Sequence, residues 1–152
     1  MILLVHMIFG AAIGFAVKSV PIAIILAILS HYFLDTLPHI EYDVGNIKAG
    51  NWQRAVPNIL KVTLDFCAGI LLISLFSNPP AGGQPIIYIC AFLAILPDGF
   101  TILNYLFPNK ISDAHDKFHE KLHFLKHKKI SSFWRISAQA FIVIVSIILL
   151  RI

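Results

Sequence analysis

Charged residues are scarce in this chain. Asp, Glu, Lys and Arg make up 13% of its 152 residues, whereas 58% are apolar and the mean hydropathy is +0.81. Soluble globular domains carry about a quarter of their residues as charged side chains. This composition excludes an ordinary soluble domain, and the length suffices for one domain only. We therefore expect a single integral membrane domain that covers residues 1–152.

Cysteine is almost absent, and the chain lacks the features of a cleaved signal peptide. The two cysteines, Cys67 and Cys90, lie within apolar runs, and we expect small buried side chains rather than a disulfide or a metal site. No basic segment precedes the first apolar run, so the first helix should be retained. The excess of positive charge is small, 12 Lys and Arg against 8 Asp and Glu, and does not predict a nucleic-acid partner.

Five apolar stretches predict an all-α bundle with about five membrane spans. The first two, from Ile2 to Val17 and from Pro21 to Leu37, form a hairpin and reach the lower limit for crossing hydrocarbon at about 1.5 Å per residue. An additional amphipathic helix, from Ser112 to His127, is too polar to span and should lie in the membrane interface. The other three spans run from Trp52 or Pro57 to Phe76, from Ile86 to Phe107 and from Ser132 to Leu150.

Prolines and polar residues separate these stretches. Pro38 ends the second stretch, and a polar loop follows from His39 to Asn51, whereas residues 78–85 form an uncharged turn. Within the fourth stretch, Pro97 lacks the N–H that a helix interior needs. It should therefore weaken that helix and free a backbone carbonyl.

Positive charge is concentrated on one side of the predicted membrane domain, while the other side holds little beyond Lys18 and Arg151. The positive-inside rule places the charged side and the N-terminus in the cytoplasm, and we expect a prokaryotic inner (plasma) membrane. Trp52 and Trp134 would anchor the same interface. The charged side contains Lys48, Arg54, Lys110, Lys117, Lys121, Lys126, Lys128, Lys129 and Arg135.

Two ionisable residues end the second apolar stretch. His31 and Asp35 are four residues apart, so they lie one above the other on a helix face. Ionisable groups beside lipid are costly and mark functional sites. The predicted hairpin sets His6 opposite His31, with Gly10 opposite Ala27 one turn further on and Gly14 opposite Ala23 after that. Asp65 and Asp98 lie at similar depth in the third and fourth stretches, so these groups should converge toward one leaflet.

Imidazoles and carboxylates together are suitable ligands for zinc, iron or manganese, and a metal ion would neutralise buried carboxylates. The alternative is a hydrogen-bonded polar network. The loop after Pro38 offers His39, Glu41 and Asp43, of which Glu41 would suit a general base acting on water. The amphipathic helix should turn His115 and His119 toward the bundle, and His123 and His127 toward solvent. The predicted ligands are His6, His31, Asp35, His39, Asp65, Asp98, His115 and His119, and the predicted catalytic groups are Glu41 and Asp98.

These motifs resemble those of a known family. The early His6, the His31-x-x-x-Asp35 helix end and Leu96-Pro97-Asp98 resemble the YdjM-like family of inner-membrane metal-dependent hydrolases. The His-x-x-x-Asp element is also similar to that of zinc-dependent phospholipases C. The resemblance implies that His31, Asp35 and Asp98 bind metal. The chain lacks the family's His-Arg…Thr-His-Ser segment, so the resemblance does not assign the remaining ligands.

The leading hypothesis is a membrane-embedded hydrolase that acts on a phosphoester of a lipid or lipid-linked substrate. It would use one or two divalent ions, of which zinc is the first candidate, to activate water. Membrane lipid is thus the expected partner. A non-haem di-iron lipid oxidase is a second interpretation, and a non-catalytic scaffold or ion-handling protein with a buried polar network is a third. Four basic residues could neutralise the substrate's phosphate: Lys48, Arg54, Lys110 and Lys117.

Overall fold

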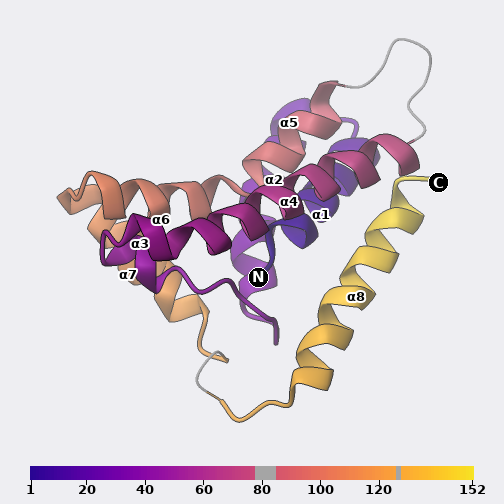
Figure 1. Cartoon of the computed structure of the whole chain (residues 1–152). Helices are drawn as coiled ribbons and strands as arrows, with labels where there is room; N and C mark the ends of the chain where they lie inside the picture. Colours follow the sequence, from indigo (N-terminus) through magenta and orange to yellow (C-terminus); the bar gives the residue numbers. More distant parts are fainter. Residues whose placement is uncertain (78–84, 126–127) are drawn as a thin grey trace.

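The computed structural model describes residues 1–77, 85–125 and 128–152, and these residues form eight α-helices and no strand (Figure 1). The expected all-α fold is confirmed. The helices are α1 (Leu3–Ala16), α2 (Val20–Asp35), α3 (Gly45–Lys48), α4 (Trp52–Phe76), α5 (Pro85–Leu93), α6 (Leu96–Leu106), α7 (Lys110–Leu122) and α8 (Ser132–Leu149).

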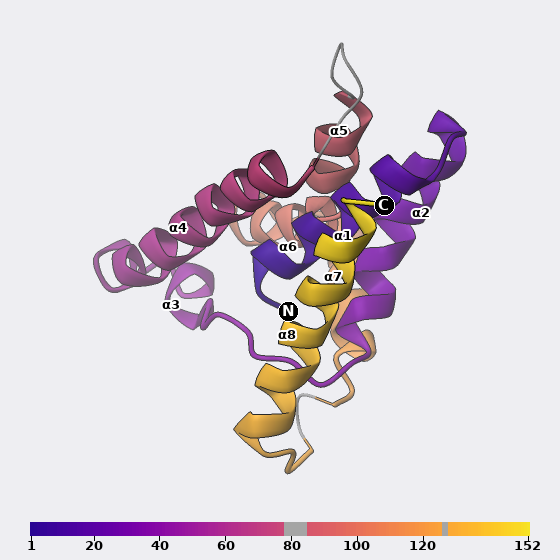
Figure 2. The same cartoon turned by 90° about the vertical axis from the view of Figure 1, so that its right-hand side faces the viewer.

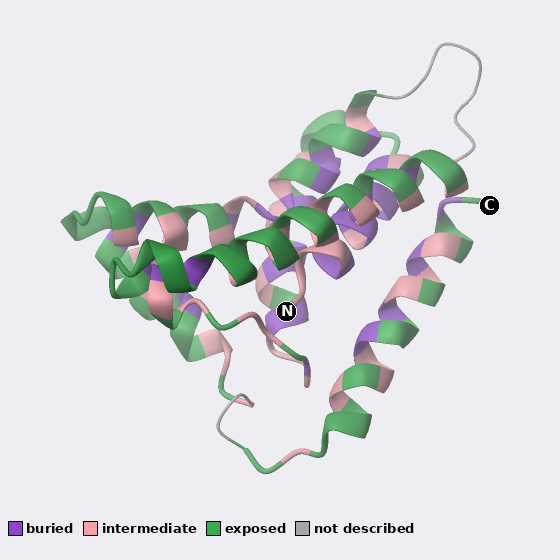
Figure 3. Cartoon of the chain, in the orientation of Figure 1, coloured by how far each residue is buried: buried purple, intermediate pink, exposed green. Residues whose placement is uncertain are grey.

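Helix α1 is the centre of the structure. It packs against α2, α4, α5 and α8, and eight of its 14 residues are buried. Figure 3 shows the contrast with α4 and α8, whose outer sides are largely exposed. These exposed sides are apolar: Leu64 on α4 is 70% exposed and Phe141 on α8 is 67% exposed. Apolar helices that expose such side chains around a buried central helix are typical of a protein surrounded by lipid.

Two helices, α4 and α8, are long and apolar enough to cross a membrane. The pair α5 and α6 would make a third crossing if it is one broken span. Helices α1 and α2 are apolar but contain only 14 and 16 residues. The structure therefore supports two to three candidate spans by length and composition, and the five-span arrangement stays a prediction. In Figure 2, α4 and α8 lie on different sides of α1.

The predicted single helix from Ile86 to Phe107 is wrong, because the chain breaks it into α5 and α6, which are bent by 46°. The expected weakening near Pro97 is confirmed. Pro97 lies in the first turn of α6, where its missing N–H would have no helical partner anyway. The break leaves Ala94 and Ile95 between two helices, and the carbonyl of Ala94 becomes available to a side chain.

The glycines of α1 lie closest to α5 and the residue after it. A Cβ atom on Gly10 would lie 2.5 Å from Ala94 Cβ and 2.6 Å from the Cys90 carbonyl oxygen, and one on Gly14 would lie 2.7 Å from the Ile86 carbonyl oxygen. The nearest neighbours at both glycines thus belong to α5 and the residue after it, whereas the sequence predicted the alanines of α2. Because glycine has no side chain, this face of α1 allows the backbone of α5 to approach closely. The predicted hairpin considered α1 and α2 alone.

Local sequence explains where several helices begin and end. The side chain of Asn109 accepts hydrogen bonds from the backbone N–H groups of Ile111 and Ser112 and so caps α7. Helix α7 ends at Leu122, earlier than predicted. His127 and most of the predicted turn lie outside the described residues. Both cysteines are free, and Cys90 is buried as expected, whereas the expectation for Cys67 is wrong because it is exposed on α4.

Candidate metal centre

The carboxylate of Asp35 is the centre of a buried histidine cluster. Asp35 is completely buried at the C-terminal end of α2. Ring nitrogens of four histidines lie within 3.4 Å of its two oxygens: His119 Nε2 (2.9 Å), His31 Nε2 (3.0 Å) and His123 Nε2 (3.4 Å) around Oδ2, and His6 Nε2 (3.2 Å) beside Oδ1. Oδ1 also accepts a hydrogen bond from the amino group of Met1 at 3.0 Å.

Three helices bring these side chains together. His31 lies one turn before Asp35 on α2, as the spacing predicted, and the two are 3.0 Å apart. The ring of His6 on α1 stacks on the ring of His31, with 4.2 Å between centroids, which confirms the predicted pairing of these two histidines. His119 reaches the cluster from α7, 84 residues away in the sequence.

Hydrogen bonds to carbonyl groups determine which nitrogen of two histidines carries the proton. His31 Nδ1 lies 2.8 Å from the Ala94 carbonyl oxygen, and His39 Nδ1 lies 2.7 Å from the Leu37 carbonyl oxygen. A carbonyl oxygen can only accept, so both Nδ1 atoms must donate. In the neutral rings, Nε2 then carries a lone pair.

These lone pairs point at negatively charged oxygens. His31 Nε2 faces Asp35 Oδ2 at 3.0 Å, and His39 Nε2 faces Glu41 Oε1 at 2.9 Å. A lone pair and a carboxylate oxygen repel each other, so each position needs either a proton or a metal ion. Protonating every ring would place several positive charges in a buried cluster, which is costly. A buried ring whose Nδ1 is held by a carbonyl is the usual arrangement of a metal-binding histidine.

The described residues contain three groups of ligand atoms that could each hold a metal ion. Within each group the atoms lie within 4.8 Å of one another. Ligands of tetrahedral zinc lie about 3.4 Å apart, given bonds of about 2.0–2.1 Å, and the atoms of His31, Asp35 and His119 lie 2.9–3.0 Å from one another. Six of the eight predicted ligands belong to these groups. The groups are His6, His31 and Asp98; His31, Asp35 and His119; and Asp35, His39 and His123.

His6 gives an independent indication that the residues fit a metal ion. Its ring is completely buried, Nδ1 has no hydrogen-bond partner, and Nε2 lies 3.2 Å from Asp35 Oδ1 without the geometry of a hydrogen bond. An unsatisfied buried polar atom costs about 1–3 kcal/mol. Coordination of an ion would remove that cost at one nitrogen. The donor set, the held Nδ1 atoms and this unsatisfied ring therefore all fit a bound divalent cation.

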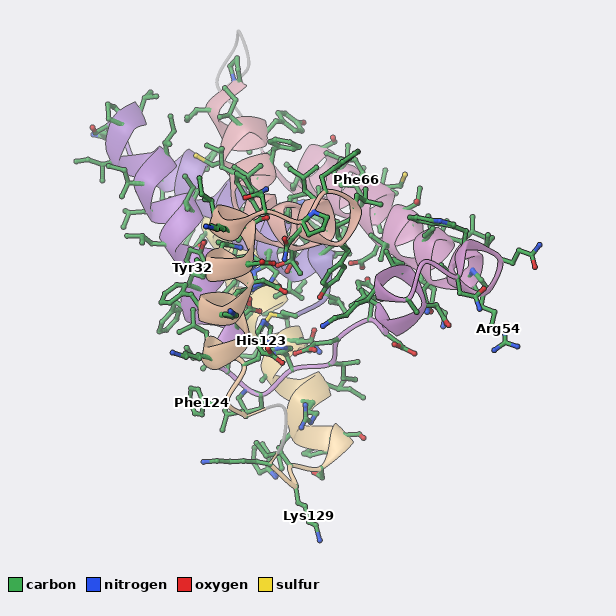
Figure 4. All side chains as sticks on the ribbon, turned by 90° about the vertical axis from the view of Figure 1, so that its left-hand side faces the viewer. Tyr32, Arg54, Phe66, His123, Phe124 and Lys129 are labelled. Carbon is green, nitrogen blue, oxygen red and sulfur yellow. The ribbon has the colours of Figure 1, made fainter. Side chains whose placement is uncertain are left out.

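His123 belongs to the centre, although the sequence predicted it toward solvent. Because α7 ends at Leu122, the direction of the His123 side chain no longer follows the helical periodicity. Its Nδ1 lies 2.7 Å from Glu41 Oε1. Figure 4 shows His123 beside the loop after α2, while the next residue, Phe124, points outward. Burial disfavours its charged form, but hydrogen bonds to Asp35 and Glu41 outweigh burial and raise the pKa of His123 to about 9. The signal in the sequence that could have identified His123 as part of the centre is its four-residue spacing from His119.

Two predicted ligands lie outside the three groups. Asp65 Oδ2 instead accepts a hydrogen bond from the backbone N–H of Leu4 at 2.8 Å. Burial and a hydrogen bond to Asp65 raise the pKa of the Tyr42 phenol. His115 Nε2 lies 3.0 Å from the hydroxyl of Tyr32, and burial together with neighbouring His119 lowers the pKa of His115. Asp65 and His115 are not in any of the three groups, and their role as ligands stays a prediction.

Replacing Asp65 with alanine should lower the free energy of unfolding without removing metal. The carboxylate satisfies an N–H group in the first turn of α1, and losing such a cap costs about 0.5–2 kcal/mol. Asp65→Asn should retain most of the stability, because the amide oxygen still accepts the hydrogen bond. Unfolding in detergent and metal content measured on both variants test this. Loss of metal from a folded Asp65→Ala protein would instead place Asp65 among the ligands.

A cavity of about 210 Å³ lies beside the centre. Its lining includes Asp98, His119, His123 and Glu41 as well as the apolar side chains of Leu3, Val62 and Ile102. Lys48 also lines this cavity, with its Nζ 5.4 Å from the centroid of the Tyr105 ring. The three other basic residues considered for phosphate binding, Arg54, Lys110 and Lys117, are exposed and are not among the cavity's lining residues.

No family model matches this chain, and neither a curated protein nor a solved structure is similar to it. The buried His and Asp groups agree with the resemblance to YdjM-like hydrolases but do not establish membership in that family. A function can therefore be inferred only from the geometry of the site.

Proposed function

We propose that this protein is a membrane-embedded, metal-dependent hydrolase that acts on a phosphoester of a lipid or lipid-linked substrate. The main support is that carbonyl groups hold His31 and His39 so that their free nitrogens face carboxylates. A cavity large enough for a small polar group lies beside that cluster.

The residues fit two ions that share Asp35. His31, Asp35 and His119 would hold the first, and Asp35, His39 and His123 would hold the second. Nitrogen and carboxylate ligands without thiolate suit zinc, with iron and manganese as the other candidates. A divalent ion in this position supplies Lewis acidity, which lowers the pKa of water and polarises a phosphoryl oxygen.

Of the two predicted catalytic carboxylates, Asp98 is better placed to move a proton. Its Oδ1 lies 3.6 Å from His31 Nε2 and 3.8 Å from His119 Nε2, and its side chain is 31% exposed toward the cavity. Glu41 also lines the cavity, but its Oε1 faces both His39 and His123. We assign Asp98 the role of a general base that takes a proton from the attacking water, and Glu41 the role of orienting the two histidines.

The cavity and the surrounding helices indicate the substrate's character. Lys48 offers a positive charge for a phosphate, while the aliphatic wall suits an apolar neighbour of that phosphate. At about 1.5 Å per residue, α1 and α2 reach roughly 21 and 24 Å, less than the hydrocarbon core of about 30 Å. We propose that they insert beside α4 and α8 in the five-span arrangement, with the centre near the cytoplasmic surface where the charged residues lie.

A matched pair of variants on α7 tests the proposal. The chain is purified in detergent as wild type, His119→Ala and His115→Ala, and each sample is analysed for bound metals and for hydrolysis of a phosphodiester presented in mixed micelles. We expect metal and activity in the wild type and in His115→Ala. His119→Ala should lose metal and at least about 100-fold in rate, because it removes a ligand next to Asp35.

Each alternative has its own outcome. Iron with redox activity and no hydrolysis would favour the oxidase. Stoichiometric metal without turnover would favour ion handling. A wild-type protein with no bound metal would favour a non-catalytic protein with a buried polar network and would contradict the proposal.

A further inference from the structure

Arg135 connects α8 to the metal centre. It lies in the first turn of α8, a helix that is long and apolar enough to cross a membrane. Its Nη1 donates to the carbonyl oxygen of His39 at 2.8 Å, and its Nη2 donates to that of Leu125 at 3.3 Å. The same guanidinium also donates to the carbonyl oxygens of Lys128 and Ile130, at 3.3 and 3.4 Å.

The two segments that Arg135 holds are those that carry one half of the centre. His39 is itself a candidate ligand, and Leu125 follows the candidate ligand His123 by two residues. Both histidines lie outside regular helices: His39 is in the loop after α2, and His123 follows the last residue of α7. His31 and Asp35, in contrast, are held by the backbone of α2. The half of the centre that lacks helical support is thus the half that Arg135 contacts.

We propose that Arg135 is a positioning residue for the ion held by Asp35, His39 and His123. The proposal rests on the function proposed above. Arginine suits this role because its planar guanidinium presents five N–H groups in a fixed fork, which can hold carbonyl groups of separate segments at once. Lysine keeps the charge but has one flexible ammonium, so it cannot reproduce that geometry. A residue needed only for charge would tolerate lysine.

The experiment uses the full chain in detergent, loaded with zinc, as wild type, Arg135→Gln, Arg135→Lys and Arg54→Gln. Arg54 is an exposed control at the start of α4, far from His123 in Figure 4. Zinc per chain is measured while a chelator is added. We expect the wild type and Arg54→Gln to release their two ions alike. Both Arg135 variants should release one ion at about 10–100-fold lower chelator concentration, while the second ion keeps its wild-type profile.

Hydrogen exchange of the metal-free proteins gives a second readout that does not depend on zinc. Backbone amides in residues 36–44 should exchange faster in both Arg135 variants than in the wild type and Arg54→Gln. If Arg135→Gln does not fold, Arg135→Lys, which preserves the charge, decides the question. Wild-type zinc release by a folded Arg135 variant, or equal weakening of both ions, overturns the proposal. If the wild-type protein binds no zinc, the proposed hydrolase is contradicted. If amide exchange in residues 36–44 is also the same in the Arg135 variants and the wild type, the role of Arg135 is overturned as well.

Discussion

Asp35→Asn should remove the bound metal and abolish hydrolysis while the chain remains folded. Asp35 is the only residue shared by the two proposed ions, and its oxygens face four histidine nitrogens within 3.4 Å. The amide has the same shape but no negative charge, and its NH₂ group can satisfy a histidine lone pair directly. We expect metal affinity to fall by more than about 100-fold, beyond the usual effect of losing an outer contact. Metal analysis and calorimetric titration with zinc measure this.

Asp113→Asn is the matched control. Asp113 accepts a hydrogen bond from the side-chain amide of Asn104 at 3.0 Å and belongs to none of the three groups. It tests whether losing an aspartate outside these groups affects metal binding indirectly. Full metal content in Asp35→Asn would show that the histidines bind without their central carboxylate and would contradict the shared-ligand arrangement.

Gly10→Ala should cause the largest loss of stability among small substitutions. The new Cβ would meet Ala94 Cβ at 2.5 Å and the Cys90 carbonyl oxygen at 2.6 Å. Neither contact belongs to a flexible side chain, so α1 and α5 must move apart. Such overpacking costs about 1–3 kcal/mol. Because the Ala94 carbonyl holds His31 Nδ1, we also expect weaker metal binding.

Gly99→Ala provides the control for the glycine substitution. Apart from its own helix backbone and chain neighbours, a Cβ at Gly99 in α6 would meet nothing within 4 Å. Alanine there should raise the free energy of unfolding by up to about 1 kcal/mol, because glycine is a poor helix former. Unfolding in detergent compares the two variants, and zinc titration follows the effect on His31. Equal stability of Gly10→Ala and Gly99→Ala would contradict the close contact of α1 with α5.

Much of the local structure could be predicted from the sequence. The spacing of His31 and Asp35 places them on one helix face, and the structure holds them 3.0 Å apart. The predicted third stretch, begun at Trp52, coincides with α4, and the expected disturbance at Pro97 occurs. These predictions succeed because side-chain periodicity and a missing N–H act over a few residues of the same helix.

The composition of the centre was predicted only in part. His6, His39, Asp98 and His119 belong to the three groups, but Asp65 does not. Asp65 was placed by depth alone, and depth does not tell which way a side chain faces around the helix axis. In the structure it faces the N-terminus of α1, where an unpaired N–H attracts a carboxylate.

The sequence by itself determined that this chain is an all-α protein rich in apolar helices, with costly histidines and aspartates among them. Composition and periodicity are enough for that, because they follow from how single helices meet water or lipid. Only the tertiary structure decided that α7 ends early and brings in His123, and that the break between α5 and α6 offers Ala94 to His31. Those outcomes depend on how distant helices pack and where their ends meet. The ligands of a metal ion must lie within a few ångströms of one point, so a site built from distant segments depends on that packing.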